Sequence, residues 1–428
     1  MVAAAALATV MTAPGQTTGV SAFIDPLIAE LGTSRTAVST AYLIGTLSGA
    51  LALPLVGRLL DRHGVGPVMA VVGLAFGAVL FAMSFVDGLV GLTAGFAGIR
   101  MAGQGALGLA ATTAVAVHVT RRRGLALGVT SAVGTGGISL APVLLERLIA
   151  AHGTAATWRI EALAVWLIVL PLALLVFRAP GQRSAQEPRP HQQAVAGTAP
   201  GAGEDTAGVP SGGASAGASP AVAADPPRSW TRAEAVRTRM FWAIAAGLAA
   251  SGMLTTALNF HQISLLGEQG LSAAQAAANF VPQTVAGLAA TLGIGALADH
   301  IAPKWCVSAS MLLLAASLLA VPLVAPGLRA IGYGVLLGAA SGALRAIEAA
   351  AYARYFGTEH LGSIRGLVTA LSVASTAFGP LLLAAGHAIT GGYTSTVVLA
   401  AVVPLGIAVV AAITAAPAVP AHRVTAHA

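Results

Sequence analysis

The sequence predicts an all-α membrane protein with twelve transmembrane helices in two pseudo-symmetric six-helix bundles. The chain has 428 residues, of which 56% are hydrophobic and 9% charged, and its mean hydropathy of +0.82 excludes an ordinary soluble domain. Twelve stretches are apolar and long enough to cross a bilayer, since each crossing needs about 20 mostly apolar residues. A short turn motif recurs once in each half, which indicates an internal duplication.

The recurring motif is Gly-x-x-x-Asp followed by a basic residue, between two long apolar stretches. It reads GRLLDRHG at 57–64 and GALADH at 295–300. Two further pairs agree, because RGL at 123–125 matches RGL at 365–367, and the Ala-Pro pair at 141–142 corresponds to the Gly-Pro pair at 379–380. The duplication therefore extends over several helices in each half.

The predicted spans divide the chain into two bundles, 1–177 and 238–416. In chain order the spans are 2–24, 36–57, 66–86, 89–117, 124–148, 158–177, 238–262, 274–298, 303–323, 327–353, 364–388 and 392–416. Pro14-Gly15 predicts a break in the first span, and Pro282 predicts a kink in the eighth.

Three further segments lie outside the bundles. Residues 178–229 are rich in Pro, Gly, Ala and Ser and cannot bury a core, which predicts a flexible cytoplasmic linker. Thr231 and Glu234 have the spacing of a capping box, so we expect a short amphipathic surface helix over 230–237, with Trp230 and Trp242 as interfacial anchors. We expect residues 417–428 to form a cytoplasmic tail.

The positions of the basic residues predict the orientation. The net charge of +7 does not indicate nucleic-acid binding, because most of the 22 Lys and Arg residues lie at span edges, as orientation signals do. With a cytoplasmic N-terminus, only Arg35, Arg147, Arg159 and Arg329 fall outside, while two arginines fall within spans. We therefore expect a multi-pass protein of the plasma (inner) membrane with both termini cytoplasmic. The apolar run at the start has no basic flank or Ala-x-Ala-like stop, so it reads as the first span.

These motifs resemble those of the major facilitator superfamily along essentially the whole chain. Residues 57–64 match the family's loop signature after the second helix, and the turn at Asp299 is its weaker copy. Residues 100–105 (RMAGQG) match the Arg-x-x-Gly-x-Gly pattern of the fourth helix. Residues 120–128 (TRRRGLALG) are similar to the basic entry to the fifth helix in the monocarboxylate porter branch. The resemblance implies the major facilitator fold and a secondary transporter that works by alternating access.

The resemblance also assigns a gating role to the turn at 57–64, which locks the cytoplasmic side when the outer side is open. The gating candidates are Gly57, Arg58, Asp61, Arg62 and Gly64, with Asp299 in the second half. A carboxylate near a helix N-terminus gains about 0.3–1 kcal/mol or more when partly buried, and a contact of that size biases two states separated by a few kcal/mol. The alternative is an ordinary loop salt bridge with topology signals.

Charged residues inside the spans are the main substrate-site candidates, because each costs at least about 2.5–3.5 kcal/mol at membrane depth. Arg345, Glu348 and Tyr352 lie at spacings that share one helix face. The guanidinium fork of Arg345 matches a carboxylate substrate, and Glu348 would carry the coupled proton. The alternative is a permanent Arg345–Glu348 pair that only holds the helix in place.

Arg100 is a second charged substrate-site candidate, with Gln104 one turn along; the alternative is structural pairing to backbone carbonyls. His261 is a proton-coupling candidate because histidine titrates near physiological pH, or else a packing residue. Asp25 is a proton-coupling candidate, or else a solvated carboxylate at the outer end. The uncharged substrate-binding candidates are Gln16, Asn259, Gln262, Asn279 and Gln283. The charged Asp/Arg pair common in the eighth helix of the monocarboxylate branch is absent, so Arg345 or Arg100 must supply the positive charge for an anion.

The sequence thus predicts a proton-coupled symporter of a small, monocarboxylate-like organic anion. It would act as a monomer in the bilayer, driven by the proton gradient, without cofactor, metal or nucleic acid. The alternative is a proton-coupled efflux pump for drugs or other hydrophobic solutes. An apolar cavity with Glu348 exposed and Arg345 engaged elsewhere would favour this alternative. An enzyme is disfavoured because the histidines are scattered and the Gly-rich run at 134–137 lacks a preceding strand and a phosphate-binding Lys. A signalling receptor would need an additional module, and the segment 178–229 is too low in complexity for one.

Overall fold

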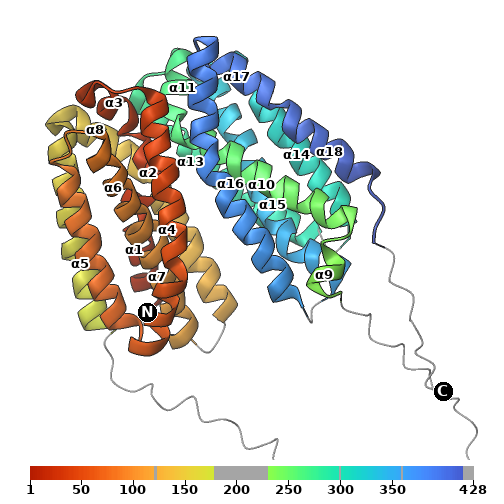
Figure 1. Cartoon of the computed structure of the whole chain (residues 1–428), viewed down its shortest axis with the longest axis horizontal. Helices are drawn as coiled ribbons and strands as arrows, with labels where there is room; N and C mark the ends of the chain where they lie inside the picture. The colour runs from red at the N-terminus through yellow and green to blue at the C-terminus, as the bar shows by residue number, and fades with distance from the viewer. Residues whose placement is uncertain (120–122, 178–229, 298–299, 358–359, 418–428) are drawn as a thin grey trace, which may run out of the picture. The chain divides into compact units, whose positions relative to one another are not determined.

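The structure is a computed structural model that describes residues 1–119, 123–177, 230–297, 300–357 and 360–417 (Figure 1). Over these residues the chain is helical and has no strand. Eight helical stretches among the described residues are long and apolar enough to cross a membrane. One of them, Leu125–Val176, contains two spans that join at Gly153, and three further spans are built from shorter helices. The predicted all-α fold of twelve spans in two bundles is confirmed.

The helices of the N-terminal bundle follow the predicted spans closely. They are α1 (Val2–Val10), the 3₁₀ turn η1 (Ala13–Gly15), α2 (Thr17–Ser21), α3 (Ile24–Leu31), α4 (Arg35–His63), α5 (Val65–Met83), α6 (Leu89–Ile99), the π-helical stretch η2 (Arg100–Leu107), α7 (Gly108–His118), α8 (Arg123–Pro171) and the π-helical stretch η3 (Leu172–Val176). The first span thus comprises α1, η1 and α2, and the fourth comprises α6, η2 and α7.

The C-terminal bundle repeats this plan. Its helices are α9 (Arg232–Ala235), α10 (Arg239–Phe260), α11 (Gln262–Glu268), α12 (Ala273–Ala278), α13 (Phe280–Leu297), α14 (Pro303–Ala320), the 3₁₀ turn η4 (Val321–Leu323), α15 (Leu328–Phe356), α16 (Leu361–Thr390), α17 (Tyr393–Ala400) and α18 (Val402–Ile413). The eighth span comprises α12 and α13, and the twelfth comprises α17 and α18.

Proline and glycine account for the interruptions. Pro14 lies in η1, and Gln16 follows in an extended conformation that ends the helical run. Pro282 has no N–H to donate to the carbonyl of Ala278, and the eighth span is interrupted there, between the end of α12 and the start of α13 at Phe280. Gly153 has φ of +80°, a left-handed conformation that glycine adopts at little cost, and it lets α8 turn between the fifth and sixth spans.

Glycines allow equivalent helix pairs in the two halves to approach closely. A Cβ at Gly137 in the fifth span would collide with Val10 of α1, and one at Gly379 in α16 would collide with the Met253 carbonyl of α10. Gly45 of α4 meets α6 in the same way, and Gly338 of α15 meets α13. Small residues at such contacts are typical of helix packing in lipid. The repeated pairs follow the internal duplication of the sequence.

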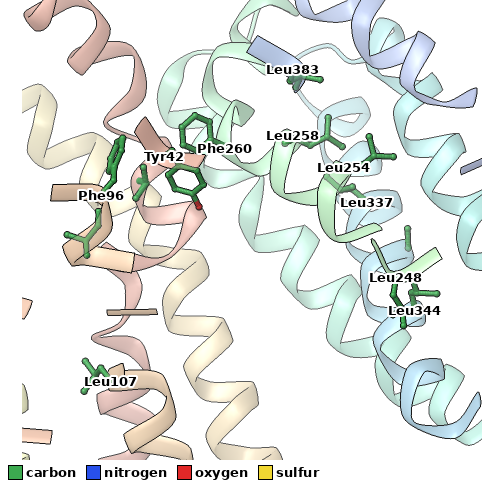
Figure 2. Close-up of a cluster of buried hydrophobic side chains, with 14 of the residues drawn as sticks. Tyr42, Phe96, Leu107, Leu248, Leu254, Leu258, Phe260, Leu337, Leu344 and Leu383 are labelled. Atoms are coloured by element: carbon green, nitrogen blue, oxygen red, sulfur yellow. The ribbon is translucent and has the colours of Figure 1, made fainter. Parts of the chain in front are cut away.

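Buried apolar side chains fill both bundles, and an aromatic contact links α4 to α10 (Figure 2). Tyr42 packs edge-on against Phe96 of its own bundle, with ring centroids 5.7 Å apart. Its ring also lies tilted against Phe260 of the other bundle, at a centroid distance of 4.5 Å. In the C-terminal bundle, the labelled leucines of Figure 2 lie on α10, α15 and α16. Both sets belong to one compact unit.

The segment before α10 begins with the capping box that the sequence predicts. The Thr231 hydroxyl accepts a hydrogen bond from the Glu234 N–H, and the Glu234 carboxylate accepts one from the Thr231 N–H. The helix itself has only four residues. Trp242 is half exposed, whereas Trp230 is buried against the ring of Phe356, so Trp230 attaches this segment to α15. The predicted linker and almost all of the predicted tail lie outside the described residues.

We predict that Gly338→Val destabilises the fold by about 1–3 kcal/mol, since the added methyl groups overpack a contact already closed by the Gln283 carbonyl. Thermal melting of the purified protein in detergent, followed by tryptophan fluorescence, measures the change. Gly293→Val on α13 is the matched control, because a Cβ there meets nothing within 4 Å. Equal melting temperatures for the two variants would contradict the packing account.

Candidate functional site

A polar cavity of about 530 Å³ is lined by both bundles. Gln16 and Thr17 border it from the first span, and Ser139 from the fifth. Asn259 of α10, Gln283 of α13 and Arg345 of α15 complete its polar wall. Ser139 also forms a hydrogen bond with Thr284 of α13 across the two halves. We call this space the central cavity.

Arg345 is the one charged residue among the described residues that line the central cavity. Its side chain is solvent-accessible although it lies well inside α15, and no hydrogen bond or ion pair joins it to any residue in the described ranges. A guanidinium at membrane depth needs a partner or water. The cavity therefore contains a positively charged fork that has no partner among the described residues.

The amides around Arg345 are partly fixed by one another. The Gln283 amide nitrogen donates a hydrogen bond to the side-chain oxygen of Gln262. The amide nitrogen of Gln262 in turn donates to the Ala276 carbonyl at 3.1 Å. Gln262 is fully buried and therefore supports Gln283 from behind. Asn259 borders the cavity, and its side-chain oxygen has no hydrogen-bond partner among the described residues. Asn279 donates to the Ala330 carbonyl at 2.6 Å and borders a separate apolar groove between α13 and α15.

Arg100 lies at the break in the first span. Its guanidinium donates to the Gly15 carbonyl at 3.1 Å and to the Thr17 hydroxyl at 3.5 Å, and it stacks over the ring of Tyr42. It borders a groove with Gln104 and is not among the residues that line the central cavity. Its hydrogen bonds satisfy a carbonyl that the break leaves without a helical partner.

The structure separates the three residues that the sequence assigned to one face of the tenth span. Arg345 lines the cavity, whereas the Glu348 carboxylate lies 3.8 Å from the Arg365 guanidinium of α16. Tyr352 is fully buried, with its ring packed against Phe241 and Phe356. No ion pair between Arg345 and Glu348 occurs in the described structure.

His261 is fully buried at the end of α10 and holds three helices together. Its Nε2 lies 3.0 Å from the Pro380 carbonyl of α16, and its Nδ1 lies 3.0 Å from the Tyr393 hydroxyl of α17. A carbonyl only accepts, so we assign the ring proton to Nε2, and Nδ1 accepts from the tyrosine.

A second polar contact joins the bundles at the end where α3, α11 and α17 lie, which we call the distal end (Figure 1). Asp25 of α3 pairs with Arg35 of α4 at 2.8 Å. Arg35 donates to the Ser264 hydroxyl of α11 at 2.9 Å, and this hydroxyl donates to both Asp25 oxygens at 2.7–2.8 Å. We call these three residues the distal latch. It ties a charged pair of one bundle to the other bundle.

The turn at 57–64 lies at the opposite, proximal end, where the N-terminus also lies. Arg58, Asp61 and Arg62 are exposed and make no hydrogen bond or ion pair with any described residue. Gly57 has open space around its Cα, and Gly64 adopts a φ of +80° that ends α4. Asp299, its counterpart, lies outside the described residues. The distal contacts are thus made, whereas the charged residues of the proximal turn form no hydrogen bond or ion pair within the described ranges.

Glu161 of the sixth span is a charged site that the sequence reasoning missed. It is 8% exposed, its Oε2 has no hydrogen-bond partner among the described residues, and it borders an apolar pocket. The signal was present, because Glu161 falls inside the predicted span 158–177, where any charge is costly. The hydroxyls of Thr17 and Ser139 were missed as well, because small polar residues are common in packed membrane helices.

Comparisons with known proteins agree with this architecture. A family model described as Major Facilitator Superfamily matches residues 5–286. No curated protein matches the chain in sequence. Two solved structures of a bacterial homolog to the human lysosomal transporter Spinster are similar over 96% of this chain and 95% of theirs, at 14% identity. One is inward-facing and occupied, with a TM-score of 0.68, and the other is inward-facing and unoccupied, with a TM-score of 0.71.

We predict that Asp25→Asn loosens the distal end, because it removes a charge that anchors both Arg35 and Ser264. Hydrogen bonds to charged groups contribute about 1.5–3 kcal/mol. The fraction of molecules in which the two bundles are apart at the distal end should therefore rise about ten-fold or more. Spin labels are attached to Thr33→Cys and Thr390→Cys in a Cys306→Ser background. Pulsed electron paramagnetic resonance then measures the distance between the two labels, one on each bundle.

Glu30→Gln provides the matched control, since Glu30 also lies on α3 but accepts its hydrogen bonds from Thr154 within its own bundle. Its distance distribution should stay that of the unsubstituted chain. A distal distance unaffected by Asp25→Asn would show that the latch does not hold the bundles together.

Proposed function

This chain belongs to the major facilitator superfamily and is a multi-pass membrane transporter, and on that premise we propose that it carries a small organic anion of the monocarboxylate type together with a proton. The observation that carries the proposal is Arg345, an accessible guanidinium with no described partner in the central cavity. No acidic residue is among the described residues that line this cavity, so its charge is positive. An anion would supply the missing partner.

A carboxylate fits this surrounding in shape as well as in charge. The planar guanidinium of Arg345 presents two parallel N–H groups, which match the two oxygens of one carboxylate. The amide of Asn259 and the hydroxyls of Thr17 and Ser139 border the same space and would bind a further hydroxyl or carbonyl of the substrate. Gln283, held by Gln262, is preorganised for the same purpose.

The two ends of the molecule support alternating access in an inward-facing state. The distal latch is closed, while Arg58, Asp61 and Arg62 at the proximal turn make no hydrogen bond or ion pair with the other described residues. Both Spinster-homolog structures with the same fold are inward-facing. We therefore assign the distal end to the outer face of the plasma membrane and both termini to the cytoplasm, in agreement with the distribution of basic residues.

Glu348 is our candidate for the coupled proton. Its ion pair with Arg365 connects α15 to the first turns of α16, and it stands one turn from Arg345 on α15. Protonation would neutralise the carboxylate and release Arg365. Asp61 would engage Arg365 or the start of α16 in the outward-facing state, which would couple the proton to the gate.

The alternative of hydrophobic efflux is less well supported. It requires an apolar cavity in which Arg345 is engaged elsewhere. The described lining is instead rich in hydroxyl and amide groups, and Arg345 makes no described ion pair.

We predict that Arg345→Gln reduces proton-driven uptake of the transported acid at least ten-fold, because the glutamine offers neither charge nor a fork. The assay is uptake of labelled lactate, pyruvate, formate and oxalate into proteoliposomes, with and without an inward proton gradient. Arg345→Lys should recover only part of the uptake, since it keeps the charge and loses the bidentate geometry.

Arg329→Gln is the matched control, because Arg329 lies on the same helix but is exposed near its beginning. Its uptake should equal that of the unsubstituted chain. Saturable uptake that survives Arg345→Gln would remove Arg345 from the site, and extrusion of hydrophobic cations would favour the efflux alternative.

We predict that Glu348→Gln abolishes accumulation driven by the proton gradient but keeps exchange of labelled for unlabelled acid at equal concentrations. The glutamine mimics the protonated side chain, so the carrier can still alternate but no longer couples to a proton. Both assays use the same proteoliposomes. Accumulation at the level of the unsubstituted chain would exclude Glu348 as the proton carrier.

A further inference from the structure

A second cavity, of about 220 Å³, lies inside the N-terminal bundle between the first, fifth and sixth spans. Its wall is apolar, with Met11 and Pro14 on the first span, Leu144 on the fifth and Val165 on the sixth. The one charged group among its described lining residues is Glu161. This cavity shares no described lining residue with the central cavity. We call it the Glu161 pocket.

The Glu161 carboxyl has no partner within the described structure. The residue is 8% exposed, and no hydrogen bond or ion pair joins it to a described residue. Neither the lining residues of α1 and η1 nor those of the fifth span in α8 carry another titratable group, and the nearby Glu146 and Arg147 of α8 are outside the lining. A carboxylate in an apolar pocket is costly, so Glu161 requires either a proton or a cation beside it.

The pocket opens toward the lipid. Leu140, Leu144 and Ile160 at its rim are 57%, 58% and 39% exposed, and such apolar exposure on a membrane helix faces the bilayer. The volume of the pocket also indicates that its ligand is a molecule rather than a proton. An aliphatic cavity of about 150 Å³ can accept benzene, so this pocket has room for an aromatic ring with a short aminoalkyl arm, whereas a proton alone needs no such space.

We propose that the Glu161 pocket binds a hydrophobic primary amine that enters from the bilayer. The neutral amine takes the proton of the carboxyl group on its nitrogen lone pair, and the resulting ammonium and carboxylate remain paired. No net charge enters the membrane in this step, and both charged groups acquire a partner.

The position of the pocket links such a ligand to transport. Ala13 and Pro14 form part of its wall, directly before Gly15, whose carbonyl binds Arg100, and Gln16, which lines the central cavity. A bound amine would contact the break of the first span, whose Gly15 carbonyl Arg100 also holds. The pocket is therefore a regulatory site, and its existence does not depend on which solute the central cavity carries.

The test is binding of 1-naphthylmethylamine to the purified full-length chain in lipid nanodiscs, measured by equilibrium dialysis with empty nanodiscs subtracted. We expect saturable binding of one molecule per chain. Glu161→Gln should weaken it about ten-fold or more, because a charge-assisted hydrogen bond is lost. The uncharged analogue 1-naphthylmethanol should bind the unsubstituted chain and Glu161→Gln about equally.

One further pocket variant and two control variants make the result decisive. Ala164→Phe fills the pocket while it keeps the carboxyl, and it should abolish amine binding. Glu146→Gln, on α8 but outside the pocket, should leave binding unchanged. Arg345→Gln should also bind the amine normally, so that failure of the transport proposal can be told from failure of this one. Amine binding that persists in Glu161→Gln or Ala164→Phe, or absence of saturable binding, would overturn the inference.

Discussion

A charged side chain within a bilayer must have a partner, and the functional anatomy of this chain follows from where each charge finds one. Arg100 binds the carbonyl that the first span frees at Gly15. Glu348 pairs with Arg365, and Asp25 pairs with Arg35. Arg345 is accessible in a cavity shared by the two bundles and has no partner among the described residues. This guanidinium still requires a negatively charged partner, and a small anion would be one.

The break in the first span connects the elements that such a transporter needs. Its extended residue, Gln16, lies on the central cavity, and the Gly15 carbonyl is bound by Arg100 of the fourth span. The Glu161 pocket lies against the residues directly before it. Because Pro14 prevents a regular α-helix here, this segment has only the short backbone bonds of a 3₁₀ turn, to which Arg100 adds a side-chain hydrogen bond. A ligand in the neighbouring pocket would therefore act on this segment.

Much of this architecture follows from the sequence, because membrane helices are specified by long apolar runs and the two copies of the Gly-x-x-x-Asp turn mark the duplication. The spacing of residues along one helix was less informative about which side chains they contact on neighbouring helices. The spacing of Arg345, Glu348 and Tyr352 predicts one shared face, but neighbouring helices give each a different environment, with Arg365 drawing Glu348 toward α16 and Phe241 enclosing Tyr352. The latch of Asp25 with Ser264 joins residues far apart in sequence, which no local pattern reveals.

The central claim is that an accessible guanidinium in an otherwise uncharged cavity selects the substrate. An experimental structure determined with a transported acid tests this claim most directly. The account predicts density for the acid with its carboxylate oxygens about 2.7–2.9 Å from the Arg345 guanidinium, next to Asn259 and Gln283. Density for the acid at another site, with Arg345 in an ion pair to a neighbouring helix, would contradict it.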